Sequence, residues 1–141
     1  MESQLKCRKE ITVRFSEVDS LRMVWHGNYI KYFEDGREEF AKQFGLGYLE
    51  TYANGYLTPI VKLECDYKKV LSFGETVIVE TTYVDDPAAK IIFEYQIFKT
   101  TDQTIICSGK TIQVFLNLNN ELQLNIPEWF EGWKKKWLKK K

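Results

Sequence analysis

The spacing of apolar side chains indicates one long amphipathic helix. From residue 27 to residue 44 they recur at steps of three and four, at Ile30, Phe33, Phe40, Ala41 and Phe44. This period predicts a helix over 27–44 with one wide apolar face. We expect Asn28 to cap its start and Gly45 to end it. Gly36 lies inside this helix, where glycine costs ~1 kcal/mol relative to alanine, so we expect close packing against another backbone there.

The segments around this helix alternate with a period of two, which is typical of strands with one buried face. Residues 9–15 predict a first strand, with Ile11, Val13 and Phe15 on one face. Further strands are predicted at 60–67, 76–84, 90–100 and 104–117. Residues 46–56 are rich in aromatic side chains and predict a short helix or an irregular cover, which either borders a pocket or belongs to the core.

Short connections between successive strands favour an antiparallel sheet. One long helix and about five strands make an α+β domain in which the sheet curls over the helix. The chain of 141 residues fits one domain, 1–141. Such a sheet has an edge and an outer surface that favour partners, so we expect at least a homodimer, with a homotetramer also possible.

Composition narrows the class of protein and the compartment. Twenty basic and twenty acidic residues cancel, which gives no preference for nucleic acid or for a membrane surface. No apolar run approaches the ~18 residues of a spanning helix, and no signal peptide is visible, so we expect a cytoplasmic protein. The cysteines Cys7, Cys65 and Cys107 show neither a pair motif nor metal-ligand spacing, so we expect free thiols and no metal.

The segment 127–141 has its own character. Trp129, Phe130, Trp133 and Trp137 recur at helical spacing, and six of the last eight residues are lysine. Pro127 suits a first helical turn, so a basic amphipathic helix is predicted. It either packs its tryptophans on the outer face of the sheet or lies on an anionic membrane, and we expect the packing.

Candidate chemistry gathers between Phe15 and Arg37. This stretch holds His26, the only histidine in the chain, and Asp19 seven residues before it. The free N–H groups at a helix start carry partial positive charge and can hold an oxyanion. Asp19 could attack a carbonyl held there or activate water to attack it. The structural alternatives are a turn role for Asp19 and a hydrogen-bonded, non-catalytic His26.

The same stretch resembles the signature of the hot-dog-fold acyl-CoA thioesterases of the 4-hydroxybenzoyl-CoA thioesterase family, most closely the branch of Tol–Pal-associated enzymes. The matching residues are Phe15, Asp19, Val24, Trp25, His26, Asn28, Tyr29, Phe33, Glu34 and Arg37. Two later segments, Cys65-Asp66-Tyr67 and Phe73-Gly74-Glu75, continue the resemblance along the chain.

The resemblance implies a thioester hydrolase that needs no cofactor. It places the catalytic carboxylate, nucleophile or general base, at Asp19. At His26 it implies a backbone N–H that polarises the thioester carbonyl, and a side chain that several relatives also need. The substrate is an acyl-CoA or an acyl-carrier-protein thioester, and the site lies at a dimer interface. The candidate substrate-binding residues on the matching positions are Trp25, Asn28 and Tyr29, and the resemblance favours Lys90 for the CoA phosphates, with Lys68, Lys69 and Lys110 as further candidates. Arg22, where the chain departs from the family, is a candidate because of its charge.

The chain departs from the family pattern at three positions. Arg22 stands in place of a glycine, Val18 in place of threonine or cysteine, and Val70 in place of a proline. A long cation at Arg22 would narrow the pocket or bind an acidic substrate group. Two other classes therefore stay open: an acyl-CoA-binding module without turnover, and a membrane-associated scaffold. A hot-dog dehydratase is disfavoured because no second histidine exists, and a cysteine nucleophile acting with His26 is disfavoured because no cysteine lies near it in the sequence.

Overall fold

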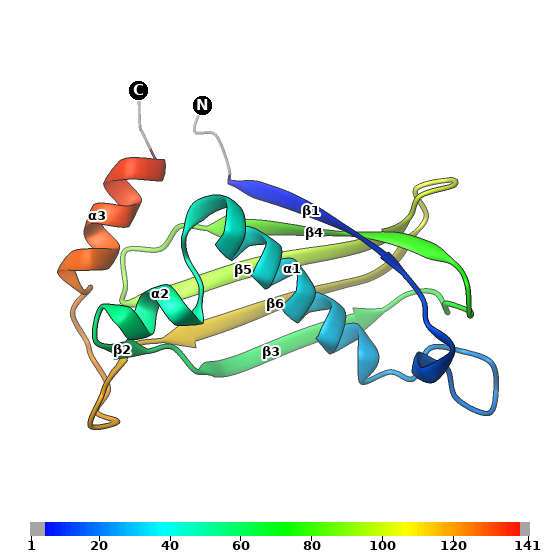
Figure 1. Cartoon of the computed structure of the whole chain (residues 1–141), viewed down its shortest axis with the longest axis horizontal. Helices are drawn as coiled ribbons and strands as arrows, with labels where there is room; N and C mark the ends of the chain where they lie inside the picture. The colour runs from blue at the N-terminus through cyan, green and yellow to red at the C-terminus, as the bar shows by residue number, and fades with distance from the viewer. Residues whose placement is uncertain (1–4, 139–141) are drawn as a thin grey trace.

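A five-stranded antiparallel sheet curves around helix α1, Asn28–Phe44, in the computed structural model of the protein, which describes residues 5–138 (Figure 1). The strand order across the sheet is β1 (Lys6–Thr12), β4 (Thr76–Val84), β5 (Lys90–Lys99), β6 (Ile105–Val114) and β3 (Ile60–Tyr67). Each strand is antiparallel to its neighbour, as predicted, and β1 and β3 form the two edges.

Shorter elements complete the described chain. They are the 3-10 turn η1 (Phe15–Glu17), helix α2 (Tyr48–Ala53), the paired strands β2 (Tyr56–Leu57) and β7 (Leu116–Asn117), and helix α3 (Glu128–Trp137). The arrangement confirms the predicted α+β class with one long central helix.

The core lies between α1 and the inner face of the sheet. Phe33 of α1 stacks on Tyr95 of β5, with ring centroids 4.4 Å apart. A Cβ atom on Gly36 would overlap the hydroxyl oxygen of Thr81 on β4, so glycine allows the helix to approach this strand. The predicted close approach at Gly36 is confirmed, although the neighbours are side chains of β4 and not backbone.

The ends of α1 were predicted with mixed success. Gly45 follows the helix with φ +67°, a left-handed conformation that glycine adopts without strain, as expected for a C-terminal stop. The prediction that Asn28 caps the start is wrong, because Gly27 occupies the cap position. The side chain of Asn28 instead donates from Nδ2 to the carbonyl oxygen of Glu17, over 2.8 Å.

The first strand was also predicted with wrong bounds, since β1 ends at Thr12 and not at residue 15. The backbone N–H of Arg14 donates to the carboxylate of Glu17 over 2.8 Å, which closes the turn η1. Phe15 begins this turn and is 76% exposed, so it does not share a buried face with Val13. The aromatic residues of α2 are exposed as well, and Tyr48 borders a cavity instead of joining the core.

Helix α3 packs on the protein, as expected, but not on the outer face of the sheet. Its buried Trp133 lies against Phe40 of α1 and Tyr83 of β4, both of which belong to the inner core. The indole N–H of Trp133 donates to the carbonyl oxygen of Phe44 over 2.6 Å, which satisfies one of the free carbonyls at the end of α1. Lys134 is fixed by an ion pair of 2.9 Å with Asp85.

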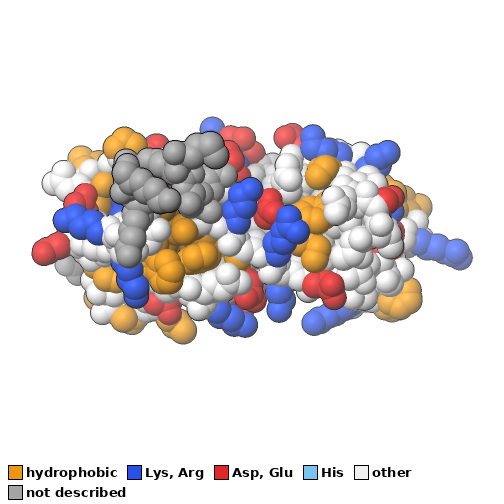
Figure 2. Space-filling model, turned by 90° about the horizontal axis from the view of Figure 1, so that it is seen from above, with side chains coloured by type: hydrophobic (Ala, Val, Ile, Leu, Met, Phe, Trp, Pro, Cys, Tyr) orange, Lys and Arg blue, Asp and Glu red, His pale blue; other side chains and the backbone are white. Residues whose placement is uncertain are grey.

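Seen from above, Lys and Arg side chains are interspersed with Asp and Glu, and apolar side chains appear between them (Figure 2). This mixture agrees with the balanced overall charge. Within residues 5–138, no helix is long and apolar enough to cross a membrane. Residues 139–141 of the predicted C-terminal basic helix lie outside the described part of the chain.

Candidate active site

Asp19 lies in a tight turn between η1 and α1. Its backbone N–H donates to the carbonyl oxygen of Met23 over 2.8 Å, and Oδ1 of its carboxylate accepts the N–H of Leu21, also over 2.8 Å. Asp19 therefore has the turn-forming role, which was one of the two roles considered for it from the sequence. Within residues 5–138 its second carboxylate oxygen, Oδ2, makes no hydrogen bond, so that atom is open to a ligand.

Arg22 adopts a left-handed backbone conformation in this turn, with φ +68°. Non-glycine residues pay roughly 1–2 kcal/mol for this conformation, which explains why a glycine suits this position. The backbone N–H of Arg22 donates to the carbonyl oxygen of Asp19 over 2.9 Å, which closes the turn. The side chain is exposed to solvent.

Glu17 anchors the loop to the helix, a role that was not predicted from the sequence. Its carboxylate accepts the N–H of Arg14 and, over 3.0 Å, the hydroxyl of Tyr32 on α1. Its backbone carbonyl accepts the N–H of Trp25 over 3.0 Å and the side-chain amide of Asn28. A glutamate three residues after Arg14 at a turn is a weak capping signal that could have been noticed.

The start of α1 leaves backbone donors free. The N–H of Trp25 is bonded to Glu17 and that of Asn28 to Trp25, over 3.0 and 2.9 Å. In the described chain, the N–H groups of His26 and Gly27 donate no such bond. The indole of Trp25 lies across Gly27, so that a Cβ atom at that position would fall inside the ring. These two amides are therefore the candidates for holding a carbonyl oxygen.

The edge strand β3 is hydrogen-bonded to the backbone of His26. The hydroxyl of Tyr67 donates to the carbonyl oxygen of His26 over 2.9 Å. The His26 ring is exposed and lies next to Trp25, with ring centroids 4.8 Å apart. Trp25 is 50% exposed, so both rings are available to a ligand.

Asn28 and Tyr29, predicted to bind substrate, are buried and support the loop from inside. Tyr29 packs edge-on against Tyr67, with centroids 5.2 Å apart. Partial burial, together with a hydrogen-bond contact to Cys65, raises the pKa of Tyr67 to about 12, so its hydroxyl keeps its proton near neutral pH. Burial raises the pKa of Tyr29 as well.

The cysteines are free thiols, as predicted. Cys65 and Cys107 lie with their sulphur atoms 3.3 Å apart across β3 and β6. Burial raises the pKa of Cys107, which leaves it a poor nucleophile. In the part of the chain described, no hydrogen bond joins a cysteine to His26.

The predicted CoA-binding lysines fall at different places. Lys90 begins β5 at the end of the sheet away from the Asp19 turn (Figure 1), so one chain does not bring these two residues together. Lys110 lies on β6, opposite Glu64 and Glu94. Lys68 and Lys69 directly follow β3 and are exposed. Their segment leads to Leu71, whose carbonyl oxygen accepts the N–H of Val24 over 2.8 Å, so these two lysines lie nearest the turn.

A sheet wrapped around one helix, with an acidic turn leading into the start of that helix, defines a hot-dog protein. Residues 13–134 match the family described as the thioesterase-like superfamily. The chain belongs to this family and is a thioester hydrolase.

Relatives and a solved structure agree with this assignment. The Bacillus subtilis (strain 168) protein named "Putative acyl-CoA thioesterase YneP" is 31% identical over 131 residues, which cover 91% of this chain and 95% of that protein. The Arabidopsis thaliana protein named acyl-acyl carrier protein thioesterase ATL3, chloroplastic, is 30% identical over 118 residues, or 84% of this chain and 62% of that protein. The crystal structure of Slr0204, a 1,4-dihydroxy-2-naphthoyl-CoA thioesterase from Synechocystis, superimposes with a TM-score of 0.82. It covers 94% of this chain and 97% of that one at 14% identity, which supports the fold alone.

Proposed function

We propose that the protein hydrolyses the thioester bond of an acyl-CoA or acyl-carrier-protein substrate, with Asp19 as nucleophile or general base. One observation carries the proposal: a carboxylate oxygen and two backbone N–H groups are left open on a single anchored loop. The open groups are Oδ2 of Asp19 and the amides of His26 and Gly27, in the part of the chain that is described.

The chemistry needs no group beyond these. The thioester carbonyl oxygen accepts the free N–H groups at the start of α1, which stabilise the negative charge that develops during attack. One such donor is typically worth ~3 kcal/mol of barrier. The carboxylate of Asp19 attacks the carbonyl carbon or removes a proton from the attacking water. If Asp19 attacks, breakage of the C–S bond releases the thiolate and leaves a mixed anhydride on Asp19, which water then hydrolyses. If water attacks, Asp19 takes its proton, the C–S bond breaks, and that proton passes to the thiolate. Both routes consume one water and release the free thiol and the carboxylic acid.

The surroundings of the turn suggest how the substrate is held. Trp25 and His26 present half-exposed and exposed rings beside the open amides, and would form a wall against the acyl group. Lys68 and Lys69 are favoured over Lys90 for the CoA phosphates, because they follow β3 toward the same loop. Arg22, at the tip of the turn, would meet an acidic group of the substrate or the carrier.

A homodimer through β3 fits the same site. Val61 is 60% exposed, Leu63 39% and Tyr67 50%, and among the strands of the described chain β3 pairs with β6 alone. Charged side chains alternate with this apolar row at Lys62, Glu64 and Asp66, as they do on the other edge, β1, at Lys6, Arg8 and Glu10, so the exposed apolar row is what distinguishes β3. An apolar exposed edge favours pairing with a second strand, and Tyr67 connects that edge to His26.

The test is the release of free thiol from a panel of short, long and aromatic acyl-CoA and acyl-carrier-protein thioesters, with Asp19→Asn alongside. Asparagine keeps an oxygen to accept the Leu21 N–H, so the turn is retained while the charge is removed. We expect turnover to fall at least ~100-fold with unchanged melting temperature. Asp35→Asn, on α1, is the matched control and retains activity. Acyl-thioester binding without thiol release, or full turnover by Asp19→Asn, would refute the proposed mechanism.

A further inference from the structure

Glu17 links the two parts of the proposed reaction centre. It lies two residues before Asp19. Its backbone carbonyl accepts the N–H of Trp25 over 3.0 Å, and Trp25 directly precedes the two open amides. Between these contacts Val18 and Val24 form an antiparallel bridge, so the loop is closed on itself. The position of Glu17 therefore decides how far the carboxylate of Asp19 lies from the amides.

Two side chains of α1 hold Glu17 in turn. The hydroxyl of Tyr32 donates to Oε1 of its carboxylate over 3.0 Å, and Nδ2 of Asn28 donates to its carbonyl oxygen over 2.8 Å. Asn28 and Tyr32 are four positions apart and buried, so both donors lie on one inner face of the helix. Burial, followed by the hydrogen bond to Glu17, raises the pKa of Tyr32, so its hydroxyl keeps the proton that it donates.

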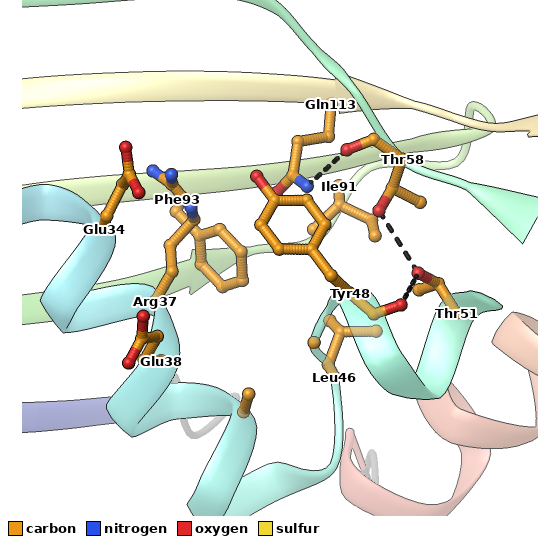
Figure 3. A pocket seen from close by; sticks show the side chains of 12 residues that line it. Glu34, Arg37, Glu38, Leu46, Tyr48, Thr51, Thr58, Ile91, Phe93 and Gln113 are labelled. Carbon is orange, nitrogen blue, oxygen red and sulfur yellow. Dashed lines mark hydrogen bonds between the residues drawn. The ribbon is translucent and has the colours of Figure 1, made fainter. Parts of the chain in front are cut away.

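The helix to which Glu17 is attached is fixed to the sheet by other residues. Figure 3 shows Arg37 pointing from α1 toward the strands, beside a cavity of about 190 Å³ between α1, α2 and the sheet. Nη1 of Arg37 donates to the hydroxyl of Tyr95 on β5 over 3.0 Å, and Phe33 stacks on the same ring. Because these contacts do not involve Glu17, loss of its side chain should displace the loop and leave the helix in place.

Two roles are open to the carboxylate of Glu17, and its contacts distinguish them. Its Oε1 accepts the N–H of Arg14 over 2.8 Å as well as the hydroxyl of Tyr32. The side chain borders a groove between β1 and α1, whose described lining includes neither Asp19 nor His26. These contacts suit a supporting role for the carboxylate better than a chemical one.

We propose that Glu17 positions the carboxylate of Asp19 and the amides of His26 and Gly27 for thioester hydrolysis, through the hydrogen bonds that it accepts. The inference rests on the proposed function, because these groups are its reaction centre. A neutral acceptor should serve nearly as well as a carboxylate. Glutamine keeps an oxygen in place of Oε1, which is the atom that both side-chain hydrogen bonds use, whereas alanine removes it.

The test measures kcat and KM for thiol release by Glu17→Ala and Glu17→Gln, on the thioester of the panel that wild type hydrolyses fastest. Glu17→Ala should lower kcat at least ~10-fold and change KM less than ~2-fold, since misplaced reacting groups cost rate and not substrate contacts. Glu17→Gln should retain kcat within ~3-fold of wild type, because the acceptor is kept. Glu10→Ala, at an exposed glutamate of β1, is the matched control and should equal wild type.

Amide hydrogen exchange, followed by NMR, tests the same inference without turnover. The N–H groups of Trp25 and Asn28 are bonded within the loop, and that of Gly45 is bonded at the other end of α1. Glu17→Ala should raise exchange at the two loop amides at least ~10-fold and leave Gly45 unchanged, as expected for a local opening. Glu17→Gln should match wild type at all three.

Tyr32→Phe removes one of the two hydrogen bonds to Oε1 and keeps the ring. It should lower kcat and raise loop exchange by at least ~3-fold, in the same direction as Glu17→Ala. This variant decides the question if Glu17→Ala does not fold, and a Tyr32→Phe protein that equals wild type would then overturn the proposal.

Three further results would overturn it. A Glu17→Gln variant as slow as Glu17→Ala would assign the effect to the charge, and wild-type kcat in Glu17→Ala would leave the residue without a role in catalysis. Faster exchange at Gly45 as well as in the loop would show a general loss of stability. Absence of thiol release by wild type would refute the proposed function alone. The hold of Glu17 on the loop is then overturned only if exchange at Trp25 is unchanged in Glu17→Ala.

Discussion

The phenolic hydroxyl of Tyr67 donates to the carbonyl oxygen of His26 over 2.9 Å, although the two residues are 41 positions apart. This bond joins the edge strand β3 to the loop that starts α1, and so fixes the peptide whose amides are proposed to hold the substrate carbonyl. The pKa of Tyr67 is raised to about 12 in the folded protein. The stabilisation that follows from this shift is fully present below the unfolded-state pKa of ~10 and is lost as the pH rises through 12.

Tyr67→Phe should therefore lower kcat more than it raises KM, because it loosens the oxyanion site without removing a substrate contact. We expect a loss of ~1 kcal/mol in stability, typical of one hydrogen bond, and a fall of several-fold in kcat. Tyr52→Phe, at an exposed tyrosine on α2, is the matched control. Identical kinetics for the two variants would show that the Tyr67 bond plays no part in catalysis.

Arg22 gives a prediction about stability in the active-site turn. Its φ of +68° is strained for any residue with a Cβ atom. Arg22→Gly should therefore be more stable than Arg22→Ala by ~0.5–1 kcal/mol in denaturant unfolding, after allowing for the extra entropy of unfolded glycine. The alanine variant loses the cation and keeps the strain, which separates the two effects. Equal stability of the variants would mean that the turn relaxes.

The apolar edge of β3 gives a prediction about assembly. Val61→Lys places a charge on the exposed edge and should shift the protein from dimer to monomer in light scattering at micromolar concentration. Glu10→Lys on the opposite edge, β1, adds a lysine of the same kind and should leave the dimer intact. A wild-type monomer at this concentration would exclude the proposed β3 interface.

The ion pair of Glu75 with Lys99 predicts a pH-dependent term in stability. A hydrogen bond from Lys99, joined by bonds from Ser72, lowers the pKa of Glu75, and the charged atoms are 2.8 Å apart. A lowered pKa favours folding above the unfolded-state pKa of ~4.5, and this contribution is lost as pH falls through the folded value.

Glu75→Gln should thus cost up to ~1 kcal/mol at pH 7, the usual scale for a partly exposed pair. The difference from wild type should shrink as the pH of the unfolding experiment falls from ~4.5 through the lowered folded-state pKa, below which Glu75 is protonated in both states. Thr101→Ala, in the same turn region, provides a neutral comparison. A difference that stays constant with pH would assign the effect to packing and not to charge.

The spacing of apolar residues predicted most of the helices and strands. The bounds of β3 and β4 and the end of α1 at Gly45 agree with the predictions, because a period of two or of 3.6 reports directly which side of an element is buried. The end of β1 was misplaced because Phe15 continues the alternation, although a local hydrogen bond from Arg14 to Glu17 bends the chain first.

Residues that act across long separations escaped prediction. Glu17 accepts hydrogen bonds from Tyr32 and Asn28, and Arg37 donates one to Tyr95, 58 positions away. No local sequence pattern predicts these contacts. The prediction of the side on which α3 packs was wrong for the same reason, since Trp133 of α3 bonds to the carbonyl oxygen of Phe44, 89 positions before it. The catalytic role of Asp19 was predicted only from the family resemblance, because its role in the turn is enough to account for an aspartate at this position.

The pairing of β1 with β4 has a consequence for synthesis on the ribosome. Arg8 bonds to Glu80 over 2.9 Å, and 72 positions separate them. At ~5–20 residues per second, Arg8 leaves the exit tunnel roughly 4–15 s before Glu80, and α1 emerges within that interval. During that interval Phe33 and Phe40 have no sheet to cover them, so the nascent chain is a natural client for a chaperone until β4 and β5 emerge.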